Sequence, residues 1–333
     1  MPPDRSGMRP SSAEPDLSIV IVSWNTCEIL RDCLKTVRDG LGGLAAEVFI
    51  VDNASKDDSA AMVEREFPEF HLLRMERNLG FAGGNNVALR EARGRHVLLL
   101  NSDTLVLGDV LSCCMAWLDA HPRVAVMGCR VVNADRTTQS TCFQDPSLVN
   151  LLLDALFLSS LRWPRFFGRY QMRHWGRDDE REVDVVTGCF MLVRRLAMDA
   201  VGLLDDTFFF CAEEADWCLR FRRAGWGVMF APVGEIVHLD GASGRKLSAQ
   251  RDVFLYAGLL HWHLKHGSGM TVWTASQILR GGLRLRRTLW LLRSWLPRGT
   301  HAAARCQHLG VVLGRWAEVH ERAKATEPPR PTT

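Results

Sequence analysis

The sequence predicts an α/β protein with a mainly parallel sheet flanked by helices and a helical C-terminal extension. Apolar, strand-like runs alternate with helix-like segments from Leu17 to about Gly241, which is typical of a parallel sheet covered by crossover helices. After Lys246 the alternation stops and two long helical segments follow. The 333 residues, 47% of them hydrophobic, suffice for one large domain with an appendage.

Four strands are expected first, with helices between them. The apolar runs read LSIVIVSW (17–24), AEVFIVD (46–52), HLLRM (71–75) and HVLLLNSD (96–103). The helix-like segments between them lie near 27–38, 59–66 and 86–92. Ligands of open parallel sheets bind at the carboxyl ends of the strands, so the residues there are the first candidates for a functional site.

Composition narrows the class of protein. The net charge of +3 does not argue for nucleic acid binding, and no run of 18 or more apolar residues predicts a membrane-spanning helix. The ten cysteines contain no C-x-x-C pair, and several, such as Cys129 and Cys189, lie in apolar strands as core thiols, which favours a reducing compartment. Residues 1–16 are rich in Pro and Ser and lack an apolar core, so we expect a disordered lead rather than a signal peptide.

Polar side chains follow each of the four strands. They include Ser23 and Asn25 after the first, Asp52 and Asn53 after the second, and Asp103 after the fourth. A carboxylate after the second strand can bind a base or ribose, and one after the fourth can bind a hard divalent cation that bridges phosphates. Each aspartate alone is more often a helix N-cap or turn residue than a ligand-binding one. Four polar strand ends together predict a ligand site.

The third strand is followed by the glycine-rich segment RNLGFAGGNN (77–86). It is not the G-x-G-x-x-G dinucleotide fingerprint, and it follows the third strand rather than the first. A glycine-rich turn at a helix start nevertheless allows close approach of the backbone to a nucleotide. By itself this segment is a weak signal.

A second group of polar residues lies downstream. Glu213, Glu214 and Asp216 begin a predicted helix, where the helix dipole tolerates acids, and Asp216 can pair with Arg220 one turn later. The adjacent Glu213 and Glu214 point in different directions on a helix, so one of them can face a cleft as a general base. His238 ends a short predicted strand and could add an imidazole to a metal site, although a lone histidine is more often structural.

The order of these motifs resembles the family 2 glycosyltransferases with the GT-A fold, most closely the bacterial rhamnosyltransferase-like branch. The resemblance covers roughly residues 17–246 and rests on six segments in the same order: VIVSWN, VDNASKDDS, RNLGFAGGNN, NSD, EEADWCLR and H…GASGRK. It assigns nucleotide-sugar binding to Ser23, Asn25, Asp52, Asn53, Asn78, Gly80, Gly84, Asn85, Ser102, Asp103, Arg245 and Lys246.

The resemblance implies an inverting, single-displacement transfer that depends on a divalent cation, Mg²⁺ or Mn²⁺. Asp103 and His238 would hold the cation, and Glu214 would deprotonate the acceptor hydroxyl. Thr187, Gly188 and Glu213 are expected on the acceptor side. Two positions depart from the family pattern: Asn101 replaces the first acid of D-x-D, and Glu214 stands where the base is usually Asp.

The expected partners are a nucleotide-sugar donor, with dTDP-rhamnose favoured, and a hydroxyl of a polyprenyl-diphosphate-linked or cell-envelope glycan. One alternative is a non-catalytic nucleotide- or carbohydrate-binding relic of the same fold, for which Asn101 is the only hint. Another is a nicotinamide-dependent oxidoreductase, but the segment SWNTCE after the first strand contains no glycine for the required fingerprint.

The sequence of the C-terminal region predicts the location of the protein in the cell. In the segment 276–296, one helical face carries Ile278, Leu285, Leu289, Leu292 and Leu296, and the opposite face carries Arg280, Arg284 and Arg287. This pattern indicates either a helix at a membrane interface or one packed on the catalytic domain or a second subunit. The apolar segment 148–163 favours lipid, so we expect peripheral attachment to the inner face of the cytoplasmic membrane. The predicted units are a lead (1–16), a catalytic domain (17–247), a helical region (248–322) and a disordered tail (323–333).

Overall fold

A mixed but mainly parallel sheet organises the first part of the computed structural model, which describes residues 15–161, 164–239, 248–295 and 300–325. Within these residues the sheet has nine strands, eight of them in the order β3-β2-β1-β4-β10-β6-β11-β5, with β8 paired to β11. Their bounds are β1 (Leu17–Ser23), β2 (Ala46–Asp52), β3 (His71–Arg74), β4 (His96–Asn101), β5 (Thr104–Val106), β6 (Val124–Val132), β8 (Arg181–Glu182), β10 (Phe190–Arg194) and β11 (Gly227–His238).

The first four strands are parallel neighbours, as the sequence predicts. Ser23 pairs in register with Asp52, and Val22 pairs with Asn101, so the carboxyl ends of β1, β2 and β4 are level. Strand β10 then enters antiparallel between β4 and β6. Strand β11 runs parallel to β6, and the short β5 pairs antiparallel with its end, where His238 lies opposite Thr104.

Helices cover both faces of the sheet because side chains alternate between the faces along each buried strand. On one face Ile19 and Ile21 pack with α1 (Cys27–Leu41), α2 (Ser59–Glu66) and α4 (Val110–Ala120). On the other face Val20 packs in the cluster that includes α3 (Gly80–Glu91), α6 (Arg195–Val201) and α7 (Glu213–Arg223). Cys129 and Cys189 are buried, unbridged thiols of this core, as expected.

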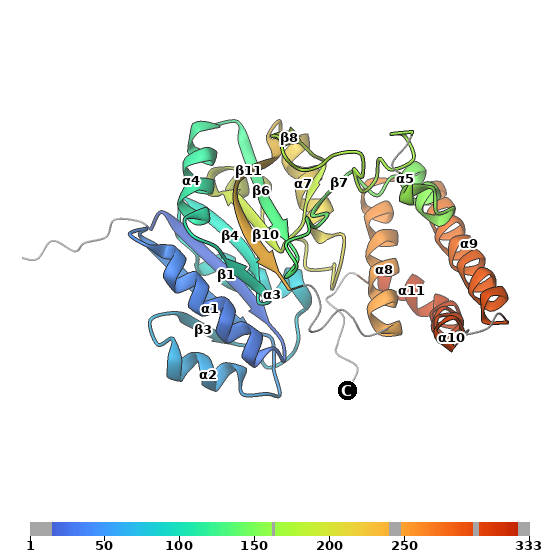
Figure 1. Cartoon of the computed structure of the whole chain (residues 1–333), viewed down its shortest axis with the longest axis horizontal. Coiled ribbons are helices and arrows are strands. Elements are labelled where there is room, and N and C mark those ends of the chain that lie inside the picture. The colour runs from blue at the N-terminus through green and yellow to red at the C-terminus, as the bar shows by residue number, and fades with distance from the viewer. Residues whose placement is uncertain (1–14, 162–163, 240–247, 296–299, 326–333) are drawn as a thin grey trace, which may run out of the picture.

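A separate apolar core joins the C-terminal helices. It contains buried side chains of α5 (Leu148–Ala155), α8 (Ala249–His266), α9 (Gly269–Ser294), α10 (Thr300–Gly314) and α11 (Trp316–Ala323). These helices lie together at one side of the sheet, with α5 beside α9 (Figure 1). A 3₁₀ turn (Leu158–Ser160) follows α5, and a small sheet pairs β7 (Cys142–Phe143) with β9 (Val185–Val186). In the described parts of the chain, no helix has the length and apolarity needed to span a membrane.

A buried carboxylate on α7 links the sheet and its covering helices to the C-terminal helices. Asp216 is fully buried and accepts from Arg220 Nε at 2.9 Å, as the sequence predicts, and also from two residues of α8, Lys265 Nζ at 2.7 Å and His266 Nε2 at 2.8 Å. Burial opposes ionisation of Asp216, but the hydrogen bonds from His266 and Lys265 outweigh it and lower its pKa to about 2. The orientation of α7 therefore depends on α8.

Three local predictions were wrong. Helix α3 begins at Gly80 rather than near Asn86, because Gly80 and Gly84 lie inside it and allow it to pack closely on the sheet. Helix α9 begins at Gly269, ahead of the predicted segment 276–296, behind a capping box of Ser268 and Thr271. The strand that ends at His238 is not short but has 12 residues. The predicted N-terminal lead and C-terminal tail lie for the most part outside the described residues.

Candidate functional site

Three hydroxyl groups meet at the ends of β1 and β4. The Ser23 Oγ lies 2.8 Å from Thr26 Oγ1, and Thr26 Oγ1 donates to Ser102 Oγ at 3.3 Å. Ser23 and Ser102 are thus brought together, as their positions at level strand ends require. Thr26 is a residue that sequence reasoning missed, and its place one turn after the first strand was the available signal.

Asp52, which pairs in register with Ser23, has one buried carboxylate oxygen without a hydrogen-bond partner among the described residues. Its side chain is only 6% exposed, and Oδ2 accepts from the Ser55 N–H at 3.4 Å. The buried Oδ1 has no hydrogen-bond partner in the described residues. Because an unpaired buried acceptor is costly, this oxygen is suited to accept from a ligand donor.

Asn25 shapes the loop next to Asp52. It adopts the left-handed conformation (φ 55°), which asparagine tolerates better than most residues. Its N–H donates to Ser55 Oγ at 3.0 Å, and its Oδ1 accepts from the Lys56 N–H at 2.6 Å. Asn25 therefore ties the loop after β1 to the loop after β2.

Asn53 and Asn78 bond to each other and to backbone rather than pointing into open space. Asn53 Nδ2 donates to Asn78 Oδ1 and to Gly80 O, both at 3.0 Å, and its Oδ1 accepts from the Leu79 N–H at 2.8 Å. Asn78 Oδ1 also accepts from the Gly80 N–H at 2.8 Å. In this structure both side chains shape the loop that leads into α3.

The glycines of α3 permit close packing behind the site. Gly80 has φ 74°, and a Cβ there would lie 2.2 Å from Phe209 O. A Cβ at Gly84 would lie 3.0 Å from Val22 Cγ1, so this glycine brings α3 close to β1. Asn85 is buried and donates to Phe81 O at 2.9 Å within the helix.

Asp103, in the turn before β5, and His238, at the end of β11, converge although 135 positions separate them in the chain. Asp103 Oδ1 lies 3.1 Å from His238 Nε2, and each side chain is 14% exposed. Asn101 Nδ2 lies 3.3 Å from the same nitrogen. Gln139, which sequence reasoning missed, contacts the other ring nitrogen, with Oε1 2.9 Å from His238 Nδ1.

This donor set fits a divalent cation. A carboxylate oxygen and an imidazole nitrogen at 3.1 Å can bind the same ion, and Mg²⁺ or Mn²⁺ commonly takes few protein ligands and completes its shell with phosphate and water. Among the residues that the structure describes, no group of three or more His, Cys, Asp and Glu side chains forms a fuller site. Arg245 and Lys246, predicted to face the diphosphate, lie outside the described residues.

Glu214 lies at the start of α7 and is held by the backbone of the segment before β10. Its Oε1 accepts from the Gly188 N–H at 3.0 Å. A Cβ at Gly188 would lie 2.3 Å from Phe81 Cζ, so only glycine fits between the carboxylate and that ring. Burial raises the pKa of Glu214, against the opposing effect of the Gly188 N–H. A half-buried carboxylate with a raised pKa is a stronger base than an exposed one.

Glu213 differs from Glu214 in its environment. It is 2% exposed, and its Oε2 has no hydrogen-bond partner within the described part of the chain. Burial, together with the neighbouring charge of Glu214, raises the pKa of Glu213 well above its usual value. The two adjacent acids therefore differ in environment, because Glu213 is the more deeply buried of the two.

The backbone before α7 is unusual. Cys211 (φ 68°) and Ala212 (φ 73°) both adopt the left-handed conformation, which non-glycine residues rarely visit. Helix α8 supports this turn from outside, because a Cβ at Gly258 would lie 2.3 Å from Cys211 O. Gly258 was missed by sequence reasoning, since only the packing of α8 on the turn shows why glycine is required.

Gly188 and Cys189 connect the carboxylate of Glu214 to the end of β4, next to Asp103 and His238. The Gly188 N–H donates to Glu214, while Cys189 O accepts from the Asn101 N–H at 3.3 Å. The neighbouring Thr187 is linked in turn to Cys189, with Oγ1 3.2 Å from Sγ. The structure therefore connects Thr187, Gly188 and Glu214 to the end of β4, where Asp103 follows.

Comparison with known proteins agrees with this arrangement. Residues 18–202, more than half of the chain, match the model of the family described as Glycosyl transferase family 2. The chain is 27% identical over 285 residues to N-acetylglucosaminyl-diphospho-decaprenol L-rhamnosyltransferase of Mycobacterium tuberculosis, covering 80% of this chain and 89% of that protein. It is 22% identical over 250 residues to the low-salt glycan biosynthesis hexosyltransferase Agl10 of Haloferax volcanii, covering 72% of each.

Solved structures share the fold. The mannosyltransferase PcManGT of Pyrobaculum calidifontis, solved with GDP-Man and Mn²⁺, superposes with a TM-score of 0.55 at 13% identity over 92% of this chain and 88% of that one. GalNAc-T7, solved with UDP, GalNAc and Mn²⁺, gives a TM-score of 0.56 at 13% identity over 96% of this chain and 59% of that one. The predicted fold class and the resemblance to family 2 glycosyltransferases are both confirmed.

Proposed function

Because the chain belongs to glycosyl transferase family 2 and is a glycosyltransferase, we propose that it catalyses an inverting, metal-dependent transfer from a nucleotide sugar, with dTDP-rhamnose the favoured donor. The observation that carries this proposal is that a candidate cation site and a candidate general base lie at the same end of the sheet. Asp103 and His238 converge at 3.1 Å, and Glu214 is held at 3.0 Å by a backbone segment that also bonds to β4.

The donor is proposed to lie across the ends of β1, β2 and β4. The unpaired Oδ1 of Asp52 would accept a hydrogen bond from the base or ribose, and the hydroxyls of Ser23 and Ser102 would contact the ribose or phosphates. Asn25, Asn53, Asn78, Gly80, Gly84 and Asn85 would act mainly by shaping the loops and the α3 start that receive the nucleotide. Arg245 and Lys246 remain predicted contacts of the diphosphate.

Asp103 and His238 are proposed to hold the divalent cation. When bound, the cation supplies positive charge that neutralises the leaving nucleoside diphosphate. The carboxylate of Asp103 contributes the charged ligand and His238 Nε2 the neutral one. Asn101, in place of a second acid, is neutral, so the pair carries one negative charge toward the phosphates.

Glu214 is proposed to act as the general base. Its carboxylate would remove the proton of the acceptor hydroxyl while that oxygen attacks the anomeric carbon from the face opposite the leaving group. The Gly188 N–H orients one oxygen of the carboxylate and leaves the other to face the acceptor. Glu213 and Thr187 would line the acceptor side, with Glu213 as a buried neighbour whose pKa is raised by burial.

The acceptor is proposed to be a polyprenyl-diphosphate-linked glycan reached at the inner face of the cytoplasmic membrane. The relative from M. tuberculosis is named for a decaprenol-diphosphate substrate. In this chain Leu285, Leu289 and Leu292 of α9 are 38–49% exposed, and Val149 and Leu152 of α5, with Leu156 directly after it, are 44–47% exposed. Apolar side chains of this size on neighbouring helices are suited to insertion at a headgroup boundary.

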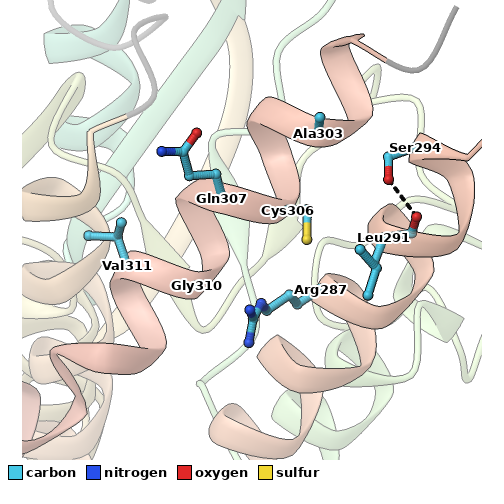
Figure 2. A pocket seen from close by; sticks show the side chains of 8 residues that line it. All are labelled: Arg287, Leu291, Ser294, Ala303, Cys306, Gln307, Gly310 and Val311. Atoms are coloured by element: carbon cyan, nitrogen blue, oxygen red, sulfur yellow. Dashed lines mark hydrogen bonds between the residues drawn. The ribbon is translucent and has the colours of Figure 1, made fainter.

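The face of α9 opposite these exposed leucines packs against the protein itself. Ala275, Leu279 and Leu283 are buried in the C-terminal core, whereas the leucines nearer the end of the helix stay exposed. A groove of about 450 Å³ also runs between α9 and α10, lined by Leu291, Ala303, Gly310 and Val311 with Arg287 beside them (Figure 2). These features support contact with lipid through the distal half of α9.

The test is a transfer assay with purified protein, Mg²⁺ or Mn²⁺ and a panel of nucleotide sugars, measuring release of nucleoside diphosphate with and without a polyprenyl-diphosphate-linked acceptor. We expect acceptor-dependent release that is fastest with dTDP-rhamnose and is abolished by EDTA. Release that ignores the metal would remove the metal from the proposal. Binding of a sugar nucleotide without any transfer would favour the non-catalytic alternative.

A further inference from the structure

Gln139 lies in a surface turn that is firmly bonded to the sheet. The turn follows β6, and the Gln139 N–H donates back to Val131 O at 2.9 Å. Within the turn, Asn133 Nδ2 donates to Thr137 Oγ1 at 2.8 Å. Arg136 bonds to Glu235 of β11 at 2.9 Å, so the turn is attached to the strand that carries His238.

The hydrogen bonds of Gln139 leave only one orientation for its side-chain amide. Its Nε2 lies 2.7 Å from the carbonyl oxygen of His238 and 2.8 Å from Asn133 Oδ1. The carbonyl can only accept, and Asn133 Oδ1 is identified as an oxygen because Nδ2 of the same side chain donates to Thr137. The NH₂ group of Gln139 must therefore face these two oxygens, and its Oε1 must face His238.

This orientation in turn selects one form of the His238 ring. Gln139 Oε1 can only accept, so His238 Nδ1, at 2.9 Å, must carry a proton. In the neutral ring Nε2 is then an unprotonated acceptor that faces Asp103 Oδ1 at 3.1 Å and Asn101 Nδ2 at 3.3 Å. An Nδ1–H donor to one side with Nε2 available on the other is the arrangement that a metal-binding histidine needs.

We propose that Gln139 is a positioning residue that sets the tautomer and ring orientation of His238 so that Nε2 is directed at Asp103. The inference rests on the proposed role of Asp103 and His238 as the cation pair, and it adds the group that prepares the pair for binding. Gln139 touches neither the donor nor the acceptor in this assignment. It acts only through the imidazole.

The first experiment needs no metal. Long-range nitrogen–proton correlation NMR of labelled histidine, at a pH where the ring is neutral, reports which nitrogen of His238 is protonated, and His238→Ala identifies its signals. We expect the Nδ1–H form in the wild type and loss of that preference in Gln139→Met, which keeps the side-chain length but has no amide. Gln144→Met is the matched control, because Gln144 contacts Arg169 instead of His238.

The second experiment measures Mn²⁺ binding by calorimetry in the presence of dTDP. Loss of a group that orients a metal ligand typically weakens binding about 10–100-fold, and we expect Gln139→Met to lose affinity in that range. At saturating Mn²⁺ its kcat should stay near that of the wild type, because the variant changes metal capture. In a His238→Ala background, Gln139→Met should have no further effect on affinity.

A second variant protects the test against misfolding. Gln139→Glu loses the donor that faces His238 O and Asn133 Oδ1 but keeps an acceptor for Nδ1, so it should retain the Nδ1–H form and bind Mn²⁺ more tightly than Gln139→Met does. An unchanged tautomer and unchanged Mn²⁺ affinity in Gln139→Met would overturn the inference, as would an Nε2–H ring in the wild type. If Mn²⁺ does not bind the wild type but the tautomer depends on Gln139, the metal part of the proposed function fails and the positioning role stands.

Discussion

The carboxyl end of the sheet and the C-terminal helices distribute polarity in opposite ways. At the sheet, charged and polar groups such as Asp52, Asp103 and Glu213 are withdrawn from solvent into the protein. On α9, Leu285, Leu289 and Leu292 face outward. Burying polar groups and exposing apolar ones both cost free energy, and the proposed function accounts for each arrangement by contact with a ligand.

Under the proposed function, the two regions serve different ligands. Withdrawn carboxylates with an unpaired oxygen or a raised pKa suit a nucleotide, a cation and a reacting hydroxyl. An exposed leucine face flanked by arginines suits an anionic lipid surface. The connection between them is α8, which supports the turn before Glu213 and pairs with Asp216.

Removing the base should have the largest effect. We expect Glu214→Gln to lower kcat about 10²–10⁴-fold with little change in donor KM, because the base acts on the acceptor in the transition state. Glu213→Gln, the matched control, should be milder. Initial rates against pH should also show activity falling as Glu214 becomes protonated, at a pH above the usual range for glutamate because its pKa is raised. If Glu213→Gln proves the more severe, the roles of the two acids are reversed.

Removing Asp103, the charged ligand of the proposed cation site, should have the second largest effect. Asp103→Ala is expected to abolish the Mn²⁺ dependence of nucleoside diphosphate binding, since His238 alone provides no negative charge. Calorimetry of dTDP with and without Mn²⁺ measures this, with circular dichroism to show that the fold is intact. Asp109→Ala is the control, because Asp109 lies in the following loop before α4. Equal dTDP affinity with and without Mn²⁺ in both wild type and Asp103→Ala would count against the cation pair.

The proposed membrane contact of α9 can be tested by reversing the charge of its exposed arginines. Arg284, Arg287 and Arg293 of α9 are exposed, whereas Arg280 is partly buried and would test folding instead. Each arginine near an anionic surface contributes about 1 kcal/mol, so changing all three to Glu should release the protein from anionic liposomes in a flotation assay. The control triple is Arg90, Arg93 and Arg123 to Glu, on exposed positions of the sheet region.

The exposed leucines of α9 can be tested separately in the same flotation assay. Leu285, Leu289 and Leu292 changed to Gln should also reduce flotation, even at high salt, where the arginine contribution is screened. Failure of the wild type to float at low salt would assign the leucine face to a protein partner instead of lipid.

The link between the two regions should give the smallest effect. The Asp216 pKa of about 2 lies below its ordinary 3.8, so its ionised form stabilises the fold above pH 3.8, and this stabilisation is lost as pH falls toward 2. The shift corresponds to about 2 kcal/mol of unfolding free energy. Urea unfolding at pH 7 and at about pH 3 should show a smaller loss on acidification in Asp216→Asn than in the wild type. An identical pH dependence in the two proteins would mean that Asp216 does not carry this linkage.

Much of the fold follows from local patterns in the sequence. The strands 17–23, 46–52 and 96–101 match the predicted runs closely, because short, mostly apolar runs bounded by polar residues suit strands buried on both faces of a sheet. The start of α7 and the Asp216–Arg220 pair follow from the spacing of neighbours on one helix. The level ends of parallel strands also place Ser23 beside Asp52 without further information.

Only the tertiary structure decided how distant residues meet. The 3.1 Å contact of Asp103 with His238 arises because β5 pairs with the end of β11, and the contact of Gln139 with His238 depends on a turn held to the same strand. Neither is encoded in local periodicity. The start of α3 at Gly80 and the burial of only one face of α9 also depend on which surfaces pack together. Hydrophobic pattern and helix spacing act over a few residues, whereas ligand geometry depends on strand order and on packing between elements far apart in the chain.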